Sequence, residues 1–69
     1  MPTSVEITGD TIKLGQLLKL ADVVDQGADA KALLAEGRVT VNGEVEVRRG
    51  RQLSRGDVVA VDGTALTVG

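Results

Sequence analysis

The sequence around Asn42 and Gly43 constrains the fold more than any other feature of the chain. Asn-Gly is the strongest short-range signal of a β-hairpin when alternating apolar residues flank it. Residues 38–41 and 44–47 each carry two valines at alternate positions. The middle of the chain is therefore predicted to form two antiparallel strands.

Two registers of this hairpin are open. A two-residue turn would pair Val41 with Glu44 and place valines on both faces of the hairpin. A three-residue loop would pair Val41 with Val45 and Val39 with Val47, so that all four valines share one face. Because a slip of one residue reverses every side chain, burial of the valines favours the three-residue loop or a bulge. On that register the outer face carries Arg38, Thr40, Glu46 and Arg48.

Two helices are predicted before the hairpin. Asp10 or Thr11 is expected to cap the first helix, which ends near Asp22. Its apolar residues recur at helical spacing: Leu14, Leu17, Leu18 and Ala21. Lys13, Gln16 and Lys19 lie off this stripe, and ordinary solvated charge explains at least one of the lysines. The second helix, residues 28–36, is expected to end at Gly37, which adopts the left-handed backbone that ends helices.

The other apolar segments predict short strands at residues 4–8, 58–61 and 64–68. Leu53 is the only apolar residue between Arg48 and Asp57, and we expect it to attach this loop to the core. The predicted fold class is α+β, with two adjacent helices packed on a small, mostly antiparallel sheet.

Composition excludes several classes of function. The 69 residues contain no cysteine, histidine or aromatic residue, so thiolate and imidazole metal sites and His- or Cys-based catalysis are excluded. We find no phosphate-binding loop motif and no apolar run of membrane-spanning length. We expect one domain over residues 1–69, with an aliphatic core, no enzymatic activity, no cofactor and no metal. The first residues lack the pattern of a signal peptide, which favours a cytoplasmic location.

Positive charge is concentrated in one short segment. The net charge of the chain is −2, yet residues 48–55 hold four arginines and no acidic residue. Residues 1–47 hold four basic and eight acidic residues, and residues 56–69 hold only two aspartates. Such an asymmetry directs an anionic partner to one face despite the overall sign.

Arginines of this kind suit phosphate, because a guanidinium donates two parallel hydrogen bonds and keeps its charge. Without aromatic residues the chain has no platform on which to stack bases, so contacts to phosphates and to RNA shape would dominate. One alternative is that the arginines pair with Glu44, Glu46 or Asp57 within the chain. Another is a protein-interaction adaptor whose arginine loop meets an acidic partner.

The order of these motifs resembles the S4 RNA-binding domain, especially small stand-alone bacterial proteins of that family. The resemblance rests on the run Lys-Ala-Leu-Leu-Ala-Glu-Gly-x-Val-x-Val-Asn-Gly from residue 31, on the Arg-Arg-Gly-Arg that follows from residue 48, and on Gly56-Asp57-Val58-Val59. It covers about residues 12–62. It implies an alpha-L core of two helices and a turn that binds structured RNA, either ribosomal or transfer RNA.

The resemblance also implies which residues contact RNA. The matching basic positions are Lys13, Lys31, Arg38, Arg48, Arg49 and Arg51. Asn42 belongs to the turn and is included as a contact, although a purely structural role is equally compatible. Gly27 and Thr40 depart from the family pattern, since many members carry basic residues there. The expected protein is a cytoplasmic monomer that binds RNA, with the ribosome or another protein as a further partner, and does not bind membranes.

Overall fold

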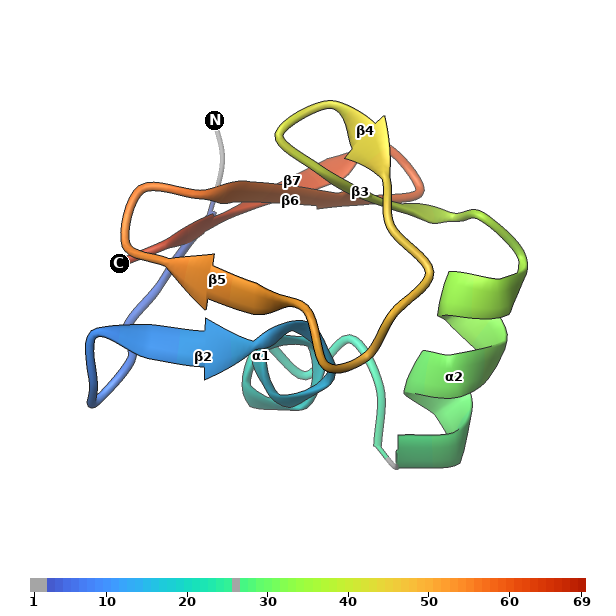
Figure 1. Ribbon diagram of the computed structural model, residues 1–69, viewed down its shortest axis with the longest axis horizontal. Coiled ribbons are helices and arrows are strands. Elements are labelled where there is room, and N and C mark those ends of the chain that lie inside the picture. The colour runs from blue at the N-terminus through green and yellow to red at the C-terminus, as the bar shows by residue number, and fades with distance from the viewer. Residues whose placement is uncertain (1–2, 26) are drawn as a thin grey trace.

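The computed structural model describes residues 3–25 and 27–69, and two sheets organise this part of the chain (Figure 1). Five strands form the larger sheet, in the order β1-β7-β6-β3-β4. Their bounds are Thr3–Val5 (β1), Val39–Val41 (β3), Glu44–Val45 (β4), Val58–Val61 (β6) and Thr64–Val68 (β7). β1 runs parallel to β7 and the other pairs are antiparallel. The expected mostly antiparallel sheet is confirmed.

The second sheet is a two-stranded ribbon that the sequence did not predict. β2 (Thr11–Lys13) pairs antiparallel with β5 (Gln52–Ser54), and Ile12 lies opposite Leu53. The predicted helix start at Asp10 or Thr11 is therefore wrong. Residues 11–13 are extended because a partner strand about forty positions later supplies their hydrogen bonds. Leu53 is fully buried and joins its loop to the core, as expected.

Two adjacent helices complete the fold. α1 (Leu14–Leu20) is shorter than predicted, and α2 (Gly27–Ala35) agrees with the prediction within one residue. Gly37 has a φ of +70°, and its amide donates to the carbonyl of Leu34, so it ends α2 as expected. In Figure 1, α1 and the β2–β5 ribbon lie on one side of the larger sheet, with α2 beside them.

The core between these layers is aliphatic. Leu14, Leu17 and Leu18 of α1 are fully buried, and so is Val59 of the central strand β6. Ala21, which was predicted to continue the α1 stripe, is only partly buried against this core. The predicted stripe therefore describes the buried face of α1 but extends beyond the end of the helix.

The register of the hairpin is the opposite of the one that valine burial favoured. Val41 pairs with Glu44 and Thr40 with Val45 across a two-residue turn. Asn42 and Gly43 have φ of +51° and +88°, and these positive angles are the ones that a type I′ turn requires.

As a consequence of this register, Val45 and Val47 are exposed, by 61% and 59%, whereas Glu46 is only 7% exposed. The predicted common face of four valines is wrong, because a carboxylate takes the inward position. The amide of Glu46 donates to the carbonyl of Val39, which fixes it there.

Candidate nucleic-acid interface

The loop that carries the clustered arginines is attached to the start of α1. The amide of Leu14 donates to the carbonyl of Arg51 at 2.9 Å, and that of Gly15 donates to the carbonyl of Arg49 at 3.0 Å. The first amides of a helix have no partner within it, so these carbonyls satisfy two of them. Figure 1 shows the chain descending from β4 to α1 before it returns through β5. Basic residues distant in sequence are thereby brought together.

Four basic residues, from β2, α1 and the loop after β4, line a groove of about 540 Å³. We call it the basic groove, and its lining residues are Lys13, Gly15, Gln16, Lys19, Ala30, Arg48, Arg49 and Gly50. A second hollow of about 470 Å³ shares Lys13, Arg48 and Gly50 with it and adds Arg51 and Gln52. The two hollows form one surface with five cationic side chains and no carboxylate in their lining.

The basic residues of the chain divide into two groups by their partners. Arg38, Arg48, Arg51 and Arg55 each lie within ion-pair distance of a carboxylate. Among residues 3–25 and 27–69, Lys13, Lys19, Lys31 and Arg49 have no carboxylate oxygen within 4 Å. Three of these four line the basic groove. The groove therefore holds most of the positive charge that internal ion pairs leave uncompensated.

Glu46 organises the two remaining arginines of this surface. Its Oε1 accepts from Nη2 of Arg48 at 3.1 Å and from Nη1 of Arg51 at 3.2 Å. The hydrogen bond from Arg48 is the main reason why the pKa of Glu46 falls to about 2 from its ordinary 4.5. Hydrogen bonds from Arg51 and the Val47 amide also lower this pKa, whereas burial of the carboxylate raises it. The Arg48 side chain stays 73% exposed. One carboxylate thus holds two guanidinium groups while leaving Arg48 open to an anion.

A pH titration of stability tests this arrangement. Because the folded pKa of Glu46 is depressed, its contribution to stability is complete above about pH 4.5 and is lost as the pH falls towards 2. We expect the difference in urea midpoint between the wild type and Glu46→Gln to shrink over that interval. Asp57 and Asp62 also have lowered pKa values, so only the difference between the two proteins isolates Glu46. A difference that stays constant down to about pH 2 would contradict the assigned pairing.

The sequence-predicted residues are only partly brought together. Lys13, Arg48, Arg49 and Arg51 meet on the surface just described. Lys31 is exposed on α2 and does not line the basic groove. Arg38 follows α2, where its guanidinium donates to Asp62 and to Glu36, and both carboxylates raise its pKa.

Lys19 and Gln16 are the polar side chains of the groove that sequence reasoning missed. They lie off the Leu14, Leu17 and Leu18 stripe of α1, and Lys19 is exposed. Their helical position was visible in the sequence, but the docking of residues 48–50 beside α1 was not.

Asn42 has a structural role within the described fold. Its Oδ1 accepts from the amide of Val58 at 2.9 Å, and its Nδ2 donates to Oδ1 of Asp57 at 3.2 Å. These bonds tie the β3–β4 turn to the start of β6. The side chain thus uses both ends of its amide inside the protein.

Replacing Asn42 by alanine should therefore lower the free energy of unfolding by about 2 kcal/mol, since two hydrogen bonds are lost and alanine disfavours a positive φ. Denaturant unfolding measures this loss. Asn42→Gly is the matched variant, because it restores backbone freedom without the hydrogen bonds and should recover part of the loss. An unchanged unfolding midpoint in Asn42→Ala would contradict the structural role.

No helix in the described ranges is long and apolar enough to cross a bilayer. Within the same ranges, the acidic residues form no group of three or more that could hold a metal ion.

The fold and the groove define a small α+β module that presents a cationic surface formed by a helix and a loop. A family model described as the S4 domain matches residues 5–69. The chain therefore belongs to the S4 domain family, as the sequence motifs indicated.

Three comparisons place the chain within this family. It is 49% identical to the probable ribosome maturation protein RlbA of Bacillus subtilis over 63 residues, which are 91% of this chain and 89% of that protein. It is 39% identical to the putative RNA-binding protein YbcJ of Escherichia coli over 57 residues, 83% and 81% of the two chains. The solution structure of E. coli YbcJ, described as revealing an alfaL motif involved in RNA binding, superimposes with a TM-score of 0.72. That comparison has 33% sequence identity and covers 96% of this chain and 85% of YbcJ.

Proposed function

We propose that the protein is a non-catalytic module that binds structured RNA through phosphate contacts in the basic groove. The observation that carries this proposal is the gathering of Lys13, Lys19 and Arg49, which have no carboxylate partner in the described structure, around one hollow with Arg48. Phosphates are the ligands that complement such a surface. The names of the relatives, a putative RNA-binding protein and a probable ribosome maturation protein, support RNA as the source of these phosphates.

Ribosomal RNA is the favoured class, because the Bacillus subtilis relative is named a probable ribosome maturation protein; transfer RNA is the second. A cytoplasmic location agrees with either partner. We propose that residues 1–69 act as one domain and as a monomer. Arg51 extends the groove surface, and Lys31 adds a contact from α2. Arg38, held by two carboxylates, contributes less than the groove residues.

A salt series tests the proposal. A labelled hairpin from ribosomal RNA is titrated with the protein at several salt concentrations, with transfer RNA, duplex DNA and single-stranded RNA alongside. About four phosphates neutralised in the groove give a slope of log affinity against log salt of about −3 to −4. We expect this slope for the structured RNAs and weaker binding to duplex DNA and single-stranded RNA. Absence of salt-dependent RNA binding even at low salt would overturn the proposal and favour an acidic protein partner.

A further inference from the structure

A third hollow adjoins the basic groove along the exposed face of α1. It has a volume of about 530 Å³ and lies between residues 6–9, β2 and α1. We call it the apolar hollow, and its lining residues are Glu6, Ile7, Thr8, Gly9, Thr11, Ile12, Gln16, Lys19 and Leu20. Gln16 and Lys19 also line the basic groove. The two sites therefore share a wall and can hold parts of one ligand.

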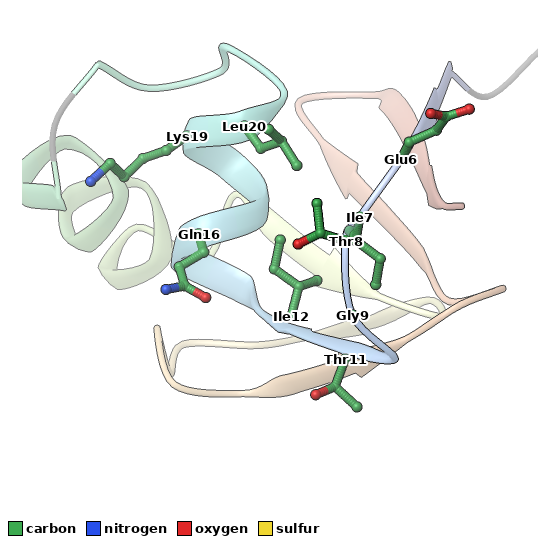
Figure 2. Close-up of a pocket in the computed structure, with 9 residues that line it drawn as sticks. All are labelled: Glu6, Ile7, Thr8, Gly9, Thr11, Ile12, Gln16, Lys19 and Leu20. Carbon is green, nitrogen blue, oxygen red and sulfur yellow. The ribbon is translucent and has the colours of Figure 1, made fainter.

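The chemistry of the apolar hollow differs from that of the groove. Figure 2 shows Leu20, Ile12 and Thr8 directed towards a common space, whereas Glu6 points away from it. Gln16 and Lys19 leave α1 on the side of α2 and form the rim. Leu20 is 55% exposed, although leucine favours burial. The hollow thus offers aliphatic surface, the Thr8 hydroxyl and a cationic rim, while the Thr11 side chain is directed away from it.

We propose that the apolar hollow receives one unpaired base of the RNA whose phosphates occupy the basic groove. This inference rests on the proposed function and adds a ligand class to it. A base has apolar faces and a polar edge, and its sugar is joined to anionic phosphates. The aliphatic floor suits the faces and the Thr8 hydroxyl suits the edge, while Gln16 and Lys19 at the rim suit the adjoining sugar and phosphate.

The base must be unpaired because a base within a helix is stacked on both sides and does not reach such a hollow. A volume of 530 Å³ lies within the range of about 300–1,000 Å³ typical of pockets for small ligands. An aliphatic pocket takes the part that aromatic platforms play in other RNA-binding proteins, and this chain has no aromatic residue. The protein therefore prefers RNA with a bulged nucleotide.

The test compares two hairpins that differ only by one bulged adenosine. The wild type should bind the bulged hairpin roughly tenfold more tightly than the fully paired one. Leu20→Ala removes the most exposed aliphatic side chain of the hollow and should greatly reduce that preference. Val45→Ala is the matched control, since Val45 is also an exposed aliphatic residue but lies on β4, outside both sites. A 2-aminopurine at the bulged position should change its fluorescence on binding to the wild type, and less so with Leu20→Ala.

The outcomes separate this inference from the proposed function. Salt-dependent binding that is equal for the two hairpins would overturn the base pocket and leave the groove intact. Loss of preference in Val45→Ala as well as in Leu20→Ala would also overturn it. Absence of all RNA binding would overturn both proposals. Circular dichroism and an unfolding curve verify that Leu20→Ala is folded, which its exposure leads us to expect.

Discussion

Replacing Lys13 and Arg49 together by glutamine should weaken binding of structured RNA about 30-fold at a salt concentration of about 0.15 M. Each lost phosphate contact removes the release of about 0.7 to 0.9 counterions, which is worth somewhat less than one decade of affinity at that salt. The slope of log affinity against log salt should become shallower by about 2. Filter binding or fluorescence anisotropy across a salt series measures both quantities.

The matched control for this variant is Arg38→Gln with Arg55→Gln, which also removes two positive charges. Arg38 already lies against Glu36 and Asp62, and Arg55 donates to the carbonyls of Ile7 and Gly69. Neither lines the basic groove. An equal loss of affinity in the control pair would show that net charge, rather than the groove, determines binding. Unfolding curves for both pairs exclude trivial loss of the fold.

Local sequence patterns predicted most of the elements because those elements depend on local chemistry. Gly37 ends α2 with a positive φ, and the Asn42-Gly43 turn forms as the dipeptide predicts. The last two strands form at the positions where short apolar runs predicted them. These features depend on residues within a few positions of one another, so a single sequence shows them.

The errors arose where partners are distant or charged. The extended conformation of residues 11–13 depends on β5, which is about forty positions later, and the helical spacing of the leucines that follow concealed it. The hairpin register was wrong because Glu46 faces inward. Its charge is compensated by Arg48 and Arg51, an arrangement that hydrophobic alternation does not indicate.

The candidate site could be predicted only in part, because some of its residues are close together in the sequence and others are brought together by the fold. Clustering in the sequence identified Arg48, Arg49 and Arg51, and family resemblance added Lys13. The tertiary structure determines which cations have carboxylate partners. It also determines that Lys19 lines the basic groove. Its membership of the groove follows from the hydrogen bonds between the start of α1 and the arginine loop.

Leu53→Ala should have the largest effect on stability, with a loss of about 2 to 5 kcal/mol in the free energy of unfolding. Leu53 is fully buried, and it pairs with Ile12 across the ribbon that joins the arginine loop, residues 48–51, to α1. Small domains have total stabilities near the lower end of about 5 to 15 kcal/mol, so this variant should be partly unfolded at ordinary temperature. Denaturant unfolding measures the loss.

Leu53→Val makes the same test in a protein that should stay folded, with a smaller loss of about 1 kcal/mol. Hydrogen exchange then shows where the loss acts. The amides of Leu14 and Gly15 donate to the loop carbonyls of Arg51 and Arg49, so they should exchange faster, whereas the amides of β6 in the larger sheet should change less. RNA affinity should fall together with the protection of these two amides from exchange, because the groove exists only while the loop lies against α1. Uniformly faster exchange over the whole chain would contradict a local role for Leu53, and unchanged stability in Leu53→Ala would contradict its place in the core.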